Sequence, residues 1–221
     1  MPRTRKPNWR NSPVIAPGFR RGVPSPAAGR KFPVEVLSGE EVRRLIKAAS
    51  PRSASGIRAR ALIAVMYRGG LRVSEVLGLY EKDLDRDAGS IRVLRGKGSK
   101  ARTIGIDSGG MGLLDRWLDH RGKLGLNGRH PIFCTLQGKR LWPSYVRALL
   151  PRLAERAGIE KRCNPHALRH SHAAELAEER LPVNLIQQQL GHANLSVTSR
   201  YLNHIMPHER VEILRKREWT L

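Results

Sequence analysis

The stretch that decides how this chain folds begins at Asn164, ends at Tyr201 and reads NPHALRHSHAAELAEERLPVNLIQQQLGHANLSVTSRY. Asn164 followed by Pro165 predicts a helix start, because an asparagine side chain caps the first turn and proline tolerates the first helical position. His166 and Arg169 are three residues apart, so one face of this helix presents both side chains. The stretch therefore predicts a helix that carries a histidine and an arginine together.

A second helix is predicted further along, where Leu185, Ile186 and Leu190 continue an apolar stripe. Gly191 follows this stripe, in the position where helices commonly stop. His192 comes directly after the predicted stop, so its side chain is expected at a helix end.

These residue types suit chemistry on a phosphate group. The guanidinium of Arg169 can bind phosphoryl oxygens in a planar fork. A histidine can take or give a proton near neutral pH, and Tyr201 can serve as a covalent nucleophile. The His-x-x-Arg pair alone is a weak signal, because the same spacing occurs by chance in many helices.

A zinc site is the alternative use of the histidines in this region. Their context is not His-Glu-x-x-His, and the two cysteines of the chain lie far apart, so no metal site is expected. The histidines in question are His166, His170, His172 and His192.

Two motifs nearer the N-terminus complete a pattern. One is GLRVSE over residues 70–75, and the other is GKG over residues 96–98, in a turn-like setting. With them the chain resembles the tyrosine recombinase family of phage-type integrases and Xer-like recombinases, from Leu37 to Tyr201 and slightly beyond. Six positions in the family's order and spacing are a specific signal, although each motif is weak by itself. The matching residues are Arg72, Lys97, His166, Arg169, His192 and Tyr201.

The resemblance implies a transesterification of DNA. Tyr201 would attack a scissile phosphodiester, form a 3′-phosphotyrosine and release a 5′-hydroxyl. That hydroxyl, or one from a partner duplex, would later attack the phosphotyrosine and reseal the strand. Since the bond energy is retained, neither a metal nor a nucleotide cofactor is expected.

The resemblance also implies a role for each other matching residue. Arg72 and Arg169 would bind the nonbridging oxygens as negative charge grows on them. His166 would take the tyrosine proton, Lys97 would protonate the leaving 5′ oxygen, and His192 would donate a hydrogen bond to a nonbridging oxygen.

The charge of the chain points to a polyanionic partner. Its 221 residues hold 41 lysines and arginines against 19 acids, a formal net charge of +22. Double-stranded DNA is the partner expected, and the alternative is a basic protein that binds nucleic acid without chemistry. The family implies a homo-tetramer on recombining sites, with a dimer on each site, and an accessory DNA-binding protein is a further candidate.

Two cysteines imply no disulfide framework, which fits a reducing cytoplasm. Within the cytoplasm, the protein is expected to associate with the nucleoid. No apolar run reaches the roughly 18 residues of a membrane-spanning helix. No membrane partner is therefore expected.

Residues 1–33 form a segment of distinct composition. They contain eight lysines and arginines, no acid and seven of the 14 prolines of the chain. Such a segment cannot bury a core and is expected to be disordered alone. It is interpreted either as a basic arm along the DNA backbone or as a solvated tail without a role.

The folded part is expected to start with two helices. Ser38 with Glu41 three residues later forms a capping-box pattern, followed by an apolar face. A second helix is predicted over residues 57–68, ended by two glycines. A short helix is predicted to begin at Arg72. Glu75, three residues later, either orients the side chain of Arg72 or makes an ordinary surface ion pair with it.

Residues 90–106 predict a β-hairpin with a turn over residues 96–99. The hairpin is strongly basic, and the glycines of the turn permit close approach to a DNA backbone. The side chains expected to contact DNA here, besides Lys97, are Arg92, Arg95, Lys100 and Arg102.

Further elements are predicted along the rest of the chain. They are a helix around residues 113–118, a short strand over residues 132–135, a helix over residues 145–157 that Pro151 should kink or split, and a final short helix near residues 211–219. That last helix is expected to dock on a neighbouring subunit or on its own domain. Some of a group of basic side chains should contact phosphates: Arg147, Arg152, Arg156, Lys161 and Arg162.

The fold class predicted is mainly α with a small antiparallel β-sheet, as one catalytic domain over residues 34–221. Relatives usually carry an N-terminal helical core-binding domain, which residues 1–33 cannot form. Two other function classes remain open: a type IB topoisomerase-like enzyme without a specific site, and a DNA-binding remnant without catalysis.

Overall fold

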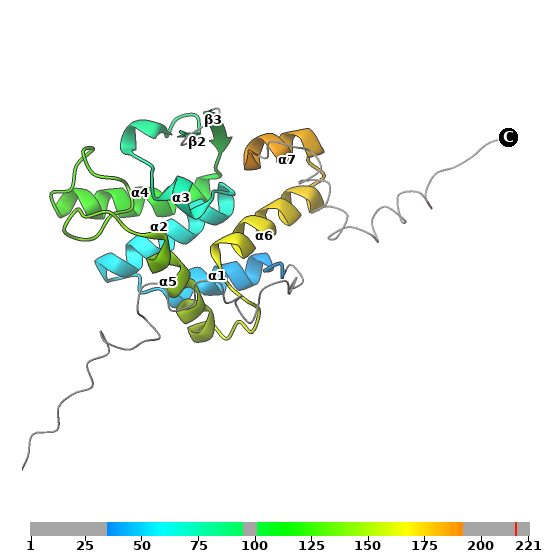
Figure 1. Ribbon diagram of the computed structural model, residues 1–221, viewed down its shortest axis with the longest axis horizontal. Coiled ribbons are helices and arrows are strands. Elements are labelled where there is room, and N and C mark those ends of the chain that lie inside the picture. Colours follow the sequence, from blue (N-terminus) through cyan, green and yellow to red (C-terminus); the bar gives the residue numbers. More distant parts are fainter. Residues whose placement is uncertain (1–34, 95–100, 192–214, 216–221) are drawn as a thin grey trace, which may run out of the picture. The chain divides into compact units, whose positions relative to one another are not determined.

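The computed structural model describes residues 35–94, 101–191 and 215 (Figure 1). The helices within this part are α1 (Gly39–Ala48), α2 (Ala54–Arg68), α3 (Val73–Val76), α4 (Ser108–Lys123), α5 (Pro143–Arg156), α6 (Pro165–Glu178) and α7 (Val183–Leu190), with a 3-10 turn at Glu81–Asp83. The strands are β1 (Leu84–Asp85), β2 (Ser90–Val93) and β3 (Arg102–Gly105). The predicted fold class, mainly helical with a small antiparallel sheet, is confirmed.

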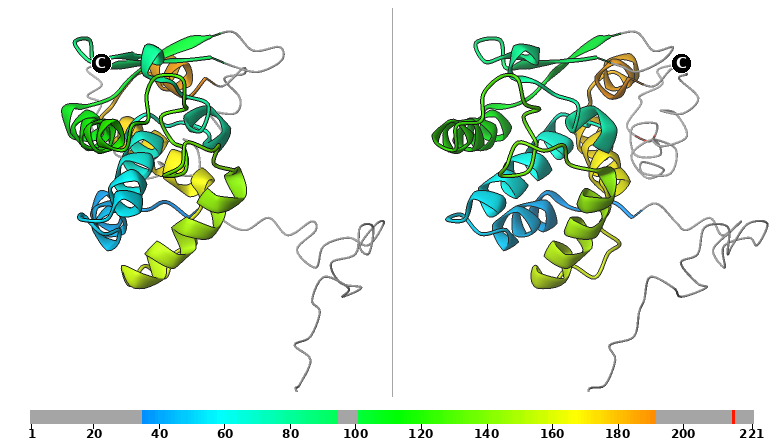
Figure 2. Two further views of the ribbon diagram at one scale, coloured as in Figure 1. Left: turned by 90° about the vertical axis from the view of Figure 1, so that its left-hand side faces the viewer. Right: turned by 60° about the vertical axis from the view of Figure 1, so that its left-hand side comes forward.

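Helix α2 is the centre of this part of the protein. Its residues from Ala61 to Tyr67 are all buried, which is the pattern of a helix enclosed on every side. It packs against α1, α3, α4 and α6, and Figure 2 shows it running between its neighbours in both views. Ser53 accepts a hydrogen bond from Gly56 N, so α2 starts three residues before the predicted start at Ile57.

The sheet is antiparallel with the order β1-β2-β3. Ile91 pairs with Ile104 across β2 and β3, and both side chains are buried in the main core. The two strands of the predicted hairpin are therefore present, and its predicted turn over residues 96–99 lies outside the described residues. Strand β1 was not predicted. A two-residue strand such as β1 gives too short a period-two pattern to be recognised from sequence.

Three predictions of local structure are corrected. Residues 132–135 are not a strand, because only an isolated bridge joins Cys134 to Arg140. Pro151 does not split α5, which runs without interruption from Pro143 to Arg156. Leu185 is 46% exposed on α7 instead of buried in the apolar stripe with Ile186 and Leu190.

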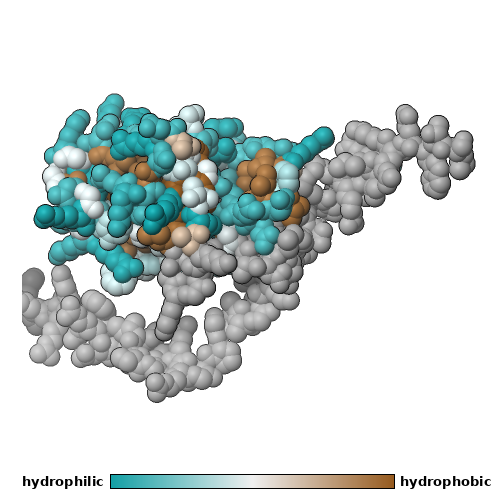
Figure 3. Space-filling view, turned by 90° about the horizontal axis from the view of Figure 1, so that it is seen from above, coloured by the Kyte–Doolittle hydropathy of each residue, from teal (hydrophilic) through white to brown (hydrophobic). Residues whose placement is uncertain are grey.

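The surface is mostly hydrophilic on the face shown in Figure 3, with separate hydrophobic patches. One patch lies at α7, where Val183 and Leu185 are exposed. Among the described residues no helix is both long and apolar enough to cross a membrane. The final helix that was predicted near residues 211–219 lies outside the described residues, apart from Arg215.

His172 of α6 is buried without a hydrogen-bond partner for either ring nitrogen within the described part of the chain. Its ring packs edge-on against the ring of Tyr67, with the two ring centroids 6.3 Å apart. Burial, followed by the nearby charges of Arg68 and Arg169, lowers the pKa of His172 to about 3, although the charge of Asp107 acts in the opposite direction. The folded protein therefore holds His172 in the neutral form over the whole range in which an exposed histidine becomes protonated.

We expect His172→Phe to remove part of the acid sensitivity of folding. The unfolded chain binds a proton at His172 below pH 6.5 and the folded chain does not, so the wild type loses stability as the pH falls from about 6.5 toward 3. At pH 5 this loss amounts to about 2 kcal/mol. Urea unfolding at pH 7 and pH 5 measures it, with His120→Phe as the control. Equal pH dependence in the wild type and His172→Phe would contradict the assignment.

Candidate active site

The start of α6 is fixed by its cap. Asn164 Oδ1 accepts hydrogen bonds from His166 N and Ala167 N, both at 2.9 Å, and Pro165 occupies the first turn. The predicted helix start is therefore confirmed. The cap fixes the first turns of the helix and with them the positions of His166 and Arg169.

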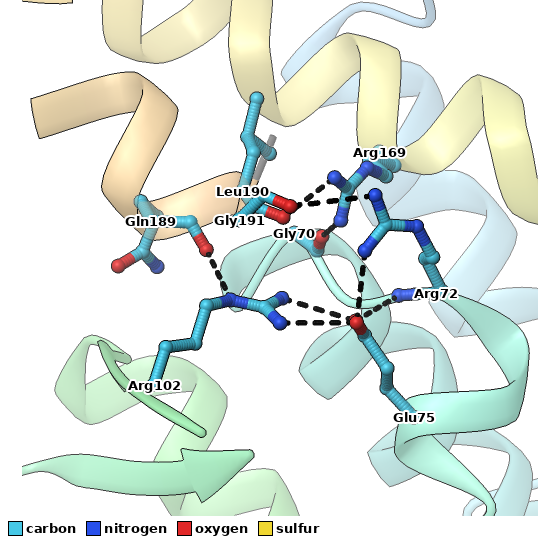
Figure 4. A network of polar contacts seen from close by, with 8 residues as sticks. All are labelled: Gly70, Arg72, Glu75, Arg102, Arg169, Gln189, Leu190 and Gly191. Carbon is cyan, nitrogen blue, oxygen red and sulfur yellow. Dashed lines mark hydrogen bonds and ion pairs between the residues drawn. The ribbon is translucent and has the colours of Figure 1, made fainter. Parts of the chain in front are cut away.

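Arg169 is 3% exposed and is held by main-chain carbonyls (Figure 4). Its Nη1 donates to Gly70 O, and its Nη2 donates to Leu190 O, both at 2.6 Å. Gly70 follows α2 and Leu190 ends α7, so the guanidinium joins three parts of the fold. This anchoring restricts the arginine to one orientation.

Gly70 has a conformation and surroundings that require glycine. Its φ is +60°, in the left-handed region that side chains disfavour. A Cβ built at this position would lie 2.6 Å from His172 Cδ2 and 2.8 Å from Leu190 Cδ2. The close approach of Gly70 to α6 and α7 brings its carbonyl to Arg169.

Arg72 is the residue before the first turn of α3, as predicted. Its main-chain N and its Nη1 both donate to the carboxylate of Glu75 at 2.9 Å, so the expected contact between these residues is present. Its Nη2 lies 3.5 Å from Gly191 O, and its side chain is 42% exposed. The guanidinium of Arg72 is thus fixed on one side and accessible on the other.

Glu75 is a shared acceptor for two arginines. Burial would raise its pKa, but hydrogen bonds and charge from Arg102 and Arg72 outweigh burial and lower the pKa to about 2. Its side chain is only 7% exposed. Glu75 is therefore ionised at neutral pH and fixed between its two partners.

Arg102 was expected to contact DNA, and the structure gives it other partners. Its Nη1 and Nη2 each donate to Glu75 at 3.0 Å, and its Nε donates to Gln189 O at 3.2 Å. Its side chain is 11% exposed. Buried Glu75 needs a countercharge, and Arg102 supplies it. Arg92 of the same hairpin is exposed, as a DNA contact requires.

A cavity of about 810 Å³ opens beside Arg72. It lies between α3, α5 and the start of α6. Six of its lining side chains are basic groups or histidine: Arg72, Arg147, Lys161, Arg162, His166 and Arg169. Arg152 and Arg156, which were also considered as phosphate contacts, do not line it. The cavity is therefore strongly positive and suits an anion.

His166 also lines this cavity, and its pKa is shifted. Burial, followed by the charges of Arg169 and Arg72, lowers its pKa below that of an ordinary histidine. The ring centroids of His166 and His170 lie 4.0 Å apart. His170 is buried, with 4% of its surface exposed. Sequence reasoning missed this contact, although the spacing of four residues on one helix could have indicated it.

The described residues contain half of the catalytic set that was expected. Arg72, His166 and Arg169 line one cavity. The other three members, Lys97, His192 and Tyr201, lie outside the described residues, as do Arg95 and Lys100. Within residues 35–94 and 101–191, no three His, Cys, Asp or Glu side chains are grouped so that they could hold a metal.

Comparison with known proteins finds similarity over most of the chain. A family model described as "Phage integrase family" matches residues 35–208. "Tyrosine recombinase XerC" of Myxococcus xanthus is 34% identical over 184 residues, which are 81% of this chain and 61% of that protein. The chain thus spans less than two thirds of the length of this curated relative.

Two solved structures are similar in fold. The crystal structure of XerA recombinase has a TM-score of 0.72 and 27% identity, over 87% of this chain and 68% of that one. The XerH recombinase bound to palindromic difH substrate, a post-cleavage complex, has a TM-score of 0.68 and 29% identity, over 86% of this chain and 55% of that one.

Proposed function

Because this chain belongs to the phage integrase family of tyrosine recombinases, we propose that it cuts and rejoins DNA strands at specific sites through a 3′-phosphotyrosine intermediate. The observation that carries the proposal is the cavity where Arg72, His166 and Arg169 meet. We further propose that residues 34–221 are the catalytic domain and that the reaction serves the integration, excision or resolution of a mobile element.

The two arginines bind the scissile phosphate in this proposal. Arg72 and Arg169 donate to its nonbridging oxygens, where negative charge grows as the fifth oxygen approaches phosphorus. Arg169 is already oriented by two carbonyls, and Arg72 by Glu75. Little reorganisation is then needed when the charge develops, which is the source of the rate enhancement.

The proton transfers fall to His166 and Lys97. His166 is neutral at pH 7, because its pKa is lowered, and it accepts the hydroxyl proton of Tyr201. The phenolate oxygen bonds to phosphorus as the bond to the 5′ oxygen breaks. Lys97 donates a proton to that leaving oxygen, and His192 donates a hydrogen bond to a nonbridging oxygen.

The partner is double-stranded DNA, in line with a net charge of +22. XerH, a relative by fold, was crystallised bound to palindromic difH substrate. We propose that a dimer occupies each site and a tetramer joins two sites. Residues 1–33 act as a basic arm along the DNA backbone, and an accessory DNA-binding protein adds to the grip. Association with the nucleoid follows from these contacts.

A capture experiment tests the proposal against its alternatives. The protein is incubated in EDTA with a pool of nicked duplexes of randomised sequence, and covalent complexes are isolated and sequenced. We expect capture without metal or nucleotide and enrichment of one sequence. Capture without enrichment would favour a type IB topoisomerase-like enzyme, and DNA binding without capture would favour a non-catalytic protein.

A further inference from the structure

Three segments that are distant in sequence meet beside Arg72 and Arg169 (Figure 4). They are the end of α7, strand β3 and the start of α3. Gln189 of α7 contacts Arg102 of β3, and Arg102 contacts Glu75 of α3. Gln189 belongs to none of the motifs that identified the family.

The side chain of Gln189 pairs with the outer edge of the small sheet. Its Nε2 donates to Gly105 O at 2.8 Å, and its Oε1 accepts from Gly105 N at 3.1 Å. Strand β3 is last in the order β1-β2-β3, so its outward main-chain groups have no neighbouring strand in this sheet. One glutamine amide therefore supplies both hydrogen bonds that another strand would supply to Gly105.

A series of hydrogen bonds links Gln189 to Arg72 through Arg102 and Glu75. Gln189 O accepts from Arg102 Nε, and the two Nη groups of Arg102 donate to Glu75. Glu75 in turn accepts from Arg72. We refer to the bonds that join Gln189 to Gly105 and to Arg102 as the α7 clasp.

Among the described residues, the apolar contacts of α7 form a small cluster, against which partly buried Leu176 and Leu181 also pack. The buried residues of its cluster are Ala173 and Ala177 of α6 with Ile186 and Leu190 of α7, and this cluster is separate from the main core. Only two of these side chains are large. The exact place of the end of α7 therefore depends strongly on polar bonds to its neighbours.

We propose that Gln189 is a positioning residue, which through the α7 clasp sets the end of α7 against Arg169 and Arg72. Leu190 O accepts from Arg169, and Gly191 O lies 3.5 Å from Arg72 Nη2, so a shift of α7 displaces both contacts. The inference rests on the proposed function, since the two arginines must bind one phosphate for their placement to matter. The chain also passes directly from Gly191 into His192, a further member of the expected set.

Gln189→Leu tests the clasp with little risk to folding. It removes both bonds of the side chain but keeps the main-chain carbonyl that binds Arg102, and exposed Gly105 can bind water instead. Gln188→Leu is the matched control, because Gln188 is exposed on the same helix next to Gln189. Both proteins are compared with the wild type on a nicked duplex captured as described above.

Two measurements give the expected result. Single-turnover adduct formation at saturating DNA should slow about tenfold in Gln189→Leu, while the Kd for DNA and the Tm stay close to those of the control. Hydrogen exchange at the Gly105 amide, measured without DNA, should become faster in Gln189→Leu alone.

Each contrary outcome has a separate meaning. Equal cleavage rates in the two variants would overturn the positioning role, and unchanged exchange at Gly105 would overturn the clasp itself. If the cleavage rate, the DNA affinity and the Tm of Gln189→Leu all fell together, Gln189 would have only a structural role. If the wild type forms no adduct, the proposed function fails and the positioning role with it, whereas exchange at Gly105 still reports on the clasp.

Discussion

Tyr201→Phe should form no covalent adduct with a nicked DNA substrate on which the wild-type protein forms one. Phenylalanine keeps the ring and removes only the oxygen that is proposed to attack phosphorus. Loss of an attacking group in a covalent mechanism lowers the rate by on the order of 10⁴-fold or more. Gel separation of labelled DNA under denaturing conditions measures the adduct directly.

Two controls make the result specific to the nucleophile. Tyr80→Phe removes a tyrosine hydroxyl from residue 80, where the ring lies near Lys82, and should leave the adduct yield unchanged. The Kd of Tyr201→Phe for DNA should equal that of the wild type. An adduct of equal yield in Tyr201→Phe would reject the assignment and require another nucleophile.

Arg72→Ala should lower the cleavage rate by about 10²–10³-fold while lowering DNA affinity by less than about tenfold. The difference arises because the contact of Arg72 with the phosphate strengthens as charge develops in the transition state. The variant should fold, since Glu75 keeps its bidentate pair with Arg102. Single-turnover cleavage and equilibrium binding at one salt concentration measure the two effects.

Arg152→Ala is the matched control for charge. Arg152 lies exposed on α5, its Nε donates to Ala148 O, and it does not line the cavity. Both variants lose one positive charge, so nonspecific attraction to DNA falls equally in both. Equal losses of binding and cleavage in Arg72→Ala would make this arginine an ordinary backbone contact.

Local signals in the sequence were sufficient for much of the fold. Ser38 with Glu41 and Asn164 with Pro165 marked helix starts that the structure confirms, and Gly191 marked the end of α7. These signals succeed because a cap or a stop depends on residues within one turn of it. Pro151 does not split α5, which continues from Pro143 to Arg156, although a proline inside a helix removes one main-chain hydrogen bond.

The parts of the site that were missed depend on contacts between distant segments. Arg102 looked like a DNA contact in a basic hairpin, and its pairing with Glu75 spans 27 residues of sequence. The bonds between Gln189 and Gly105 span 84 residues and follow no local pattern. The carbonyl acceptors of Arg169 are equally invisible, because every residue has such a carbonyl.

The anchoring of Arg169 by main-chain carbonyls has a consequence for evolution and for redesign. A side-chain acceptor can be lost by one substitution, whereas the oxygen of residue 190 survives any change of side chain that keeps α7 intact. Position 70 is the opposite case, because only glycine fits its left-handed backbone beside His172 and Leu190. Leu190 is itself buried in the apolar cluster of α6 and α7, so a variant library should accept other apolar side chains at position 190 and reject every substitution at position 70.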